Sequence, residues 1–185
     1  MAIIKAKMQR PNINALFGDI DLSASNLKIS SAAELLQKLS INEYPIDLNV
    51  ILQKYDITLE AAKFNNDDLS GMLIGENGNY KIIVNENHSQ NRKSFTIAHE
   101  LGHYFLHRDL QDKCEDQVFF RGATSDNIEL QANIFAGELL MPENEFKNEI
   151  LIGVNTIPEL ANYFGVSTLA VRVRAKQLNL SGHGL

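Results

Sequence analysis

Apolar residues recur at intervals of three and four along four stretches of the chain, a spacing typical of amphipathic helices. Residues 31–39 and 47–55 form the first pair, and residues 95–107 and 126–142 form a longer pair. Pro142 is expected to end the last helix, because proline cannot continue helical hydrogen bonding. The pattern therefore predicts two short helices followed by two longer ones.

Three segments between these helices are typical of β-strands: residues 57–61, 71–75 and 80–84. Asn77 and Gly78 separate the last two segments and readily adopt the positive φ angles of a tight hairpin turn. We therefore expect these two strands to pair antiparallel. The predicted fold class is α+β, with a small antiparallel sheet packed on helices.

The end of the chain has the pattern of a helix-turn-helix. Apolar residues precede a turn at Gly165, and Ser167 is placed to cap a second helix. This pattern favours a division into a main domain over residues 31–152 and a helix-turn-helix-like subdomain over residues 153–185. The preceding residues 1–30 show weak periodicity and predict a mobile N-terminal arm.

The last predicted helix is basic, because it carries Arg172, Arg174 and Lys176. These side chains could contact DNA phosphates, but such cations are also typical of a solvated helix near its negatively polarised end. The formal net charge of the chain is −6, whereas nucleic-acid-binding domains usually carry a basic excess. We therefore favour a structural or partner-docking subdomain over a DNA-binding one.

Length and composition are typical of a globular protein, since 185 residues with 44% hydrophobic content can bury a substantial core. The single cysteine, Cys114, excludes an internal disulfide bond. The sequence shows neither the apolar run of a signal peptide nor an apolar stretch of about 18 residues that would span a membrane. We expect a cytoplasmic protein.

Two histidines and a carboxylate, His99, Glu100 and His103, lie together in the first of the long helices. Residues four apart share one face of a helix, so both imidazoles can bind one zinc ion while Glu100 reaches the metal's water. The apolar residues bury an adjacent side of this helix, as the floor of a cleft requires. The alternative is a solvated stripe without metal, because such short motifs also occur by chance.

A third protein ligand must come from elsewhere, with the fourth position left open for water. His107 fails on geometry, because it lies roughly 12 Å beyond His99 along the helix axis, whereas zinc ligands lie about 2 Å from the ion. The metzincin spacing would require a histidine at the position of Asp109. We interpret His107 as a packing or substrate-facing residue.

Glu129, on the second long helix, is the donor that we prefer. Asn133 follows it four residues later and is placed to orient a ligand through a hydrogen bond. Glu138 is the rival donor, but nine residues at about 100° each put it on the opposite side of the helix. The alternative role for Glu129 is structural, because Asp126 three residues before it resembles a capping box.

Small residues on the two long helices predict a close contact between them. They are Gly102 on the first helix and Ala132 and Ala136 on the second. A close approach of the two backbones would allow one metal ion to be shared between the helices.

The two motifs together resemble those of the ImmA/IrrE-type zinc metallopeptidases. The first is Phe-Thr-Ile-Ala-His-Glu-Leu-Gly-His over residues 95–103, and the second is Glu-Leu-Gln-Ala-Asn-Ile-Phe-Ala over residues 129–136, followed by Leu-Leu-Met-Pro. Ile-Val-Asn over residues 83–85, before a link to Arg92, also fits. The resemblance spans residues 31–178, and the paired motifs are far more specific than either alone.

This resemblance implies a gluzincin-like fold in which His99, His103 and Glu129 are the zinc ligands. It implies that Glu100 is the catalytic base. It also implies bacterial or phage regulators that cleave DNA-binding repressors, including those of mobile elements, stress responses and toxin-antitoxin loci.

The expected chemistry is hydrolysis, in which Glu100 takes a proton from water whose pKa zinc lowers towards about 7. Tyr104, His107 and His88 are candidates for stabilising the oxyanion, and their spacing does not choose among them. One edge of the hairpin could hold an extended substrate, although a purely structural sheet fits equally well. Cys114 could occupy the open zinc position, but a lone cysteine in a loop is usually incidental.

Two functions therefore follow from the sequence. The first is a zinc endopeptidase that cuts a specific cytoplasmic regulatory protein, such as a repressor. The alternative is a DNA-binding or partner-binding regulator, for example an antitoxin-like protein, with a structural or vestigial zinc site. Glu100 favours the first, because a structural metal needs no base beside its ligand.

Overall fold

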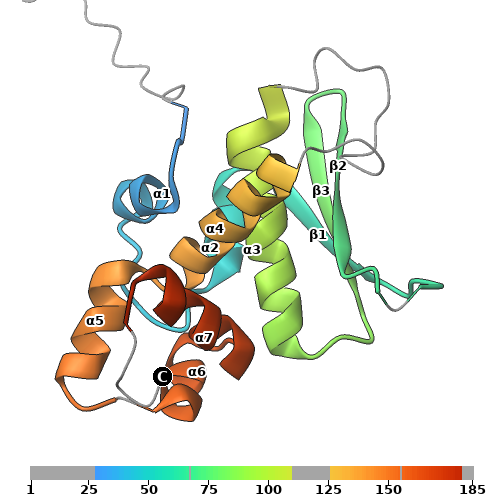
Figure 1. Cartoon of the computed structure of the whole chain (residues 1–185). Helices are drawn as coiled ribbons and strands as arrows, with labels where there is room; N and C mark the ends of the chain where they lie inside the picture. The colour runs from blue at the N-terminus through green and yellow to red at the C-terminus, as the bar shows by residue number, and fades with distance from the viewer. Residues whose placement is uncertain (1–27, 67, 110–125, 155, 181–185) are drawn as a thin grey trace, which may run out of the picture.

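The computed structural model describes residues 28–66, 68–109, 126–154 and 156–180, which form seven helices and three strands (Figure 1). The N-terminal arm expected over residues 1–30 lies outside the described residues except for its end, and Cys114 lies outside them too. In chain order the elements are α1 (Ala32–Leu39), α2 (Leu48–Lys54), β1 (Ile57–Ala62), β2 (Gly71–Glu76), β3 (Asn79–Asn85), α3 (Gln90–His107), α4 (Asp126–Leu140), α5 (Glu143–Leu151), α6 (Ile157–Phe164) and α7 (Thr168–Gln177).

The strands β2 and β3 form the predicted antiparallel hairpin. Asn77 and Gly78 turn the chain with φ angles of 51° and 80°, and the pair Glu76–Asn79 closes the turn. Asparagine and glycine tolerate this left-handed region better than other residues. The hairpin prediction is therefore confirmed together with its turn.

The expectation of a wholly antiparallel sheet is wrong, because β1 pairs with β3 in parallel. The strand order is β1-β3-β2, so β3 is central and β2 is an edge. Since β3 runs opposite to β2, a simple meander would have placed β2 between β1 and β3. Placing β3 in the centre brings together two strands that run in the same direction, and the sheet is mixed.

The helix α3 lies between the sheet and α4 (Figure 1). It packs against β2 and β3 on one side and along α4 on the other, while α4 also contacts α1. These contacts make α3 the central element of the fold. Of the described helices, none is both long enough and apolar enough to cross a membrane.

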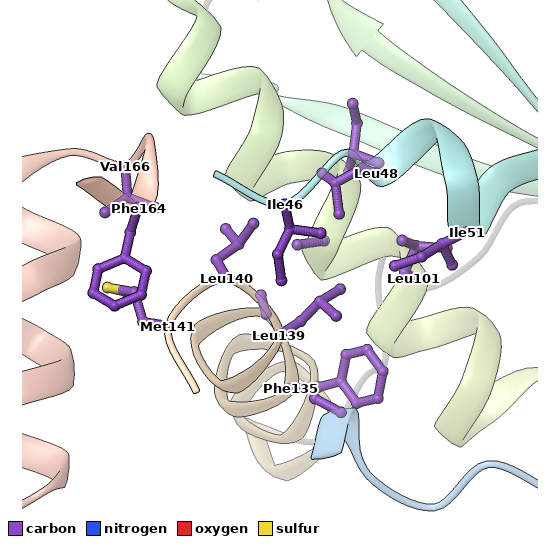
Figure 2. Packing of buried hydrophobic residues seen from close by; sticks show 14 of the residues in the cluster. Ile46, Leu48, Ile51, Leu101, Phe135, Leu139, Leu140, Met141, Phe164 and Val166 are labelled. Carbon is purple, nitrogen blue, oxygen red and sulfur yellow. The ribbon is translucent and has the colours of Figure 1, made fainter. Parts of the chain in front are cut away.

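The hydrophobic core continues from the α3–α4 contact into the C-terminal helices (Figure 2). The rings of Phe146 on α5 and Phe164 on α6 stack nearly parallel, with centroids 5.7 Å apart. The core thus includes residues on both sides of the boundary expected near residue 152. Buried members labelled in Figure 2 are Ile46, Leu48, Ile51, Leu101, Phe135, Leu139, Leu140, Met141, Phe164 and Val166.

Two helices separated by a turn are present where the sequence predicts them near the C-terminus. Gly165 ends α6 in the left-handed conformation, with a φ of 63°, and the Ser167 hydroxyl accepts a hydrogen bond from the Ala170 backbone to cap α7. The helix α5 was not predicted, because its sequence is mostly polar and Phe146 is its one large buried apolar residue. The packing of a single aromatic ring leaves little periodicity to detect.

The expected exposure of the basic residues on α7 needs a correction. Arg174 is only 5% exposed, and its Nε donates a hydrogen bond to the Met141 carbonyl oxygen at 2.9 Å. A guanidinium held in this way cannot reach a DNA phosphate, so Arg174 is a structural residue. Arg172 and Lys176 are exposed.

Candidate metal centre

The two histidines of the motif lie one turn apart on α3, a helix that Ser89 caps at its start. The Nε2 atoms of His99 and His103 are 3.0 Å apart. The side chain of His103 is 4% exposed and that of His99 is 18% exposed, so the pair stands at the edge of the core. Such a pair is ready to bind a single ion from one face of the helix.

Glu129 on α4 completes a group of three side chains. Its Oε2 lies 3.3 Å from His99 Nε2, and its Oε1 lies 3.4 Å from His103 Nε2. Ligand atoms about 2.1 Å from a tetrahedral zinc ion lie roughly 3.4 Å from each other. The three side chains therefore fit a zinc ion in chemistry and in spacing.

The approach of α4 depends on small residues, as the sequence predicts. A Cβ atom added at Gly102 would lie 3.0 Å from the Ala132 Cα and 3.1 Å from the Ala132 carbonyl oxygen. The two backbones are therefore in direct contact beside the histidines. This contact brings Glu129 within reach of both rings.

Asn133 makes the contact that the sequence predicts for it. Its Oδ1 lies 3.0 Å from His99 Nδ1. Because an amide oxygen only accepts hydrogen bonds, the hydrogen of the neutral imidazole is on Nδ1. The lone pair of His99 is then on Nε2, which lies 3.0 Å from His103 Nε2.

His107 and Gln131 make a second arrangement that the sequence analysis missed. His107 is 2% exposed, with its Nδ1 at 3.2 Å from His103 Nδ1 and its Nε2 at 2.9 Å from Gln131 Oε1. Burial agrees with the expected packing role of His107 and conflicts with a substrate-facing role or a role as oxyanion donor. The four-residue spacing of His103 and His107 was the available signal, whereas nothing in the sequence singled out Gln131.

Burial favours the uncharged form of His99 and His103. Desolvation, together with the neighbouring His99 and His107, lowers the pKa of His103 to about 3. Desolvation also lowers the pKa of His99, although the Glu129 carboxylate opposes this shift. Neutral imidazoles are the form that binds metal ions, so this environment prepares both rings for coordination.

The remaining candidates occupy different surroundings. Glu100 follows the first histidine and is 7% exposed. Tyr104 is buried among aromatic rings, with Tyr80 at a centroid distance of 4.8 Å, which does not favour a role as oxyanion donor. His88 lies in the bend before α3, and its role as an oxyanion donor stays a prediction.

A pocket of about 710 Å³ opens beside the centre, between α3, α4 and α7. Asn133, which contacts His99, is part of its wall. Two arginines and no acidic residue line it, although the whole chain is acidic. Its other lining residues are Ser89, Asn91, Phe95, Leu130, Gly137, Met141, Ser167, Leu169, Ala170, Val173 and Gln177.

Comparison with known proteins places the chain in a family. The profile of the IrrE N-terminal-like domain, a peptidase family, matches residues 52–176, which include all three side chains of the centre. The chain belongs to the ImmA/IrrE family. The resemblance of the two sequence motifs is thereby confirmed.

Two curated relatives support the assignment to the ImmA/IrrE family. Metallopeptidase ImmA of Bacillus subtilis (strain 168) is 30% identical over 111 residues, which cover 59% of this chain and 64% of ImmA. An uncharacterised immunity region protein 2 of Bacillus phage phi105 is 28% identical, over 77% of this chain and 84% of the phage protein. The family is therefore represented among both bacterial and phage proteins.

A solved structure shares the fold. A Mycobacterium tuberculosis transcriptional regulator superposes with a TM-score of 0.58 over 78% of this chain and 44% of the regulator. At 19% sequence identity, this similarity concerns the fold. The α+β arrangement of this family member thus occurs within a longer protein.

Proposed function

We propose that this protein is a zinc-dependent endopeptidase that hydrolyses a peptide bond in a specific cytoplasmic regulatory protein, such as a DNA-binding repressor. The observation that carries the proposal is the grouping of two imidazole nitrogens with the Glu129 carboxylate. The nitrogens are 3.0 Å apart, and each lies 3.3 or 3.4 Å from one of the two carboxylate oxygens. Glu100 stands directly beside the first of these ligands. Two helical histidines and a glutamate from the next helix are a gluzincin-like arrangement.

The chain's own residues divide the work. His99, His103 and Glu129 hold the ion, and Glu129 is 42% exposed, so this side of the centre is accessible. A bound zinc ion supplies a Lewis acid that acidifies water and polarises a peptide carbonyl. Glu100 accepts the proton of the attacking water as the new C–O bond forms, and delivers it to the leaving amine as the C–N bond breaks.

The substrate is proposed to lie between the pocket and the sheet. Within the described residues, β2 is the hairpin edge with one paired side, whereas β3 is paired on both. An extended segment can add to such an edge through backbone hydrogen bonds. The pocket beside Asn133 then suits apolar side chains of the same segment, because its lining is mostly apolar.

The kind of substrate is inferred from the relatives. ImmA is a metallopeptidase, and the phage relative comes from an immunity region. These names support a regulator as the substrate. The burial of Arg174 favours a structural or partner-docking role for α6 and α7 over DNA binding.

The decisive experiment combines metal analysis with cleavage. The purified protein is expected to contain zinc and to cut the repressor-like product of the neighbouring gene, and a chelator should abolish the cut. Glu100→Gln should keep the zinc and lose cleavage, because the amide cannot accept the proton. If Glu100→Gln retains both zinc and the full biological output, the centre serves a binding regulator instead.

A further inference from the structure

The ring of His107 on α3 connects His103, a proposed metal ligand, to Gln131 on α4. Its Nδ1 lies 3.2 Å from His103 Nδ1, and its Nε2 lies 2.9 Å from Gln131 Oε1. His107 is buried, whereas Gln131 is exposed on α4. The three side chains thus form a continuous polar line from the surface to the centre.

The contact of His107 with Gln131 determines where the hydrogens of His107 and His103 lie. The Gln131 amide oxygen can only accept, so the hydrogen of a neutral His107 is on Nε2. His107 Nδ1 is then an acceptor, and it takes the hydrogen that His103 carries on its own Nδ1. The lone pair of His103 is therefore on Nε2.

That lone pair faces the other ligands. His103 Nε2 lies 3.0 Å from His99 Nε2 and 3.4 Å from the Glu129 carboxylate. Because the Asn133 amide likewise places the hydrogen of His99 on Nδ1, both Nε2 atoms present lone pairs. Three electron-rich atoms this close favour a cation between them.

We propose that His107 and Gln131 are positioning residues, which fix the tautomer and ring orientation of His103 so that its Nε2 binds the metal. The proposal rests on the proposed function, because it concerns the same centre. It also explains why α4 carries two amides. Gln131 and Asn133 are about 200° apart on the helix, so each serves a histidine from its own side of the Gly102–Ala132 contact.

The test measures the affinity for zinc alone, by competition with a fluorescent chelator near neutral pH. His107→Phe keeps an aromatic ring but removes both nitrogens, and should weaken zinc binding roughly 10- to 100-fold. His107→Asn offers an amide oxygen in place of Nδ1 and should restore most of the affinity. This rescue would not occur if the ring only filled space.

Gln131 provides a second pair of variants that need not disturb the core, since this residue is exposed. Gln131→Leu removes the acceptor and should weaken zinc binding, whereas Gln131→Glu keeps an acceptor oxygen and should retain it. Ile134→Ala, on the same exposed part of α4, is the matched control and should leave the affinity unchanged. Chemical denaturation of the zinc-free variants separates changes in folding from changes in affinity.

Nuclear magnetic resonance of the ring nitrogens gives an independent readout. In the zinc-free protein, His103 is expected to carry its hydrogen on Nδ1, and His107→Phe should mix the two tautomers. An unchanged His103 tautomer together with an unchanged zinc affinity in His107→Phe would overturn the positioning role of His107 and Gln131, while the endopeptidase proposal would stand.

Two further outcomes are distinguishable. If the wild-type protein fails to bind zinc, both the positioning role of His107 and Gln131 and the proposed function are wrong. If the wild type binds a second zinc ion that His107→Phe abolishes, His107 is a ligand itself and the positioning role is overturned.

Discussion

Gly102 on α3 lies directly against Ala132 on α4, so that a Cβ atom at Gly102 would stand 3.0 Å from the Ala132 Cα. The same Cβ would lie 3.3 Å from the Phe135 Cβ. Such distances leave no room for a methyl group unless one backbone moves. Because α4 carries Glu129, the size of residue 102 determines where the Glu129 carboxylate lies relative to the two histidines.

Gly102→Ala is therefore expected to destabilise the protein by up to about 2 kcal/mol, because crowding costs about 1–3 kcal/mol and the gain in helix propensity offsets about 1 kcal/mol. Gly137→Ala is the matched control on α4. Its Cβ would meet only Gln177 Oε1, at the ordinary distance of 3.7 Å, so this variant should gain up to about 1 kcal/mol. Urea denaturation of the zinc-free proteins measures both changes.

The same variant should weaken zinc binding, because a displaced α4 moves the Glu129 carboxylate away from the histidines. Equal stabilities for Gly102→Ala and Gly137→Ala would show that the helix contact is looser than described. A lower stability with unchanged zinc affinity would show that Glu129 can follow the movement.

Glu129→Ala separates the ligand role from the capping role. Loss of a ligand should lower the zinc content of the purified protein to a small fraction, whereas loss of a cap would cost about 1 kcal/mol of stability and leave the zinc in place. Glu138→Ala is the control, because Glu138 lies on the same helix but outside the three-residue group. Metal analysis after gel filtration decides between the two roles, and normal zinc in Glu129→Ala would remove this residue from the centre.

The sequence predicted the parts of the molecule that depend on local spacing. The i,i+4 pair His99 and His103 and the Asn77-Gly78 turn are set by helix and hairpin geometry, which a short stretch of chain determines. The contact between Gly102 and Ala132 also followed, because small residues on two amphipathic helices have a direct consequence for packing.

Other features depend on contacts between distant segments. The parallel pairing of β1 with β3 depends on which strand takes the centre of the sheet, and strand sequences do not encode this order locally. The sequence predicts that Arg174 is a solvated cation, because the hydrogen bond to the Met141 carbonyl oxygen depends on the packing of α7 near the end of α4. Gln131 is one of many polar residues until the α3–α4 crossing brings it to His107.

Asn133→Leu should weaken zinc binding roughly 10- to 100-fold, because the ring of His99 loses the acceptor that holds its hydrogen on Nδ1. Asn133→Asp keeps an acceptor at the same position and should bind zinc at least as well as the wild type. Chelator competition gives both affinities. A Leu variant as tight as the Asp variant would mean that the 3.0 Å contact does not orient the ligand.

Arg174→Ala should destabilise the protein by about 2 kcal/mol, since it removes a charged donor from the Met141 carbonyl oxygen and leaves that buried oxygen without its partner. Burial lowers the pKa of the guanidinium, while Glu138 and Glu143 raise it, so the charge is held inside the fold by nearby acidic groups. Arg172→Ala, on the exposed face of α7, should stay within about 0.5 kcal/mol of the wild type. Urea denaturation compares the two variants. Equal stabilities would show that Arg174 is a solvated cation, as the sequence suggests, and not a structural residue.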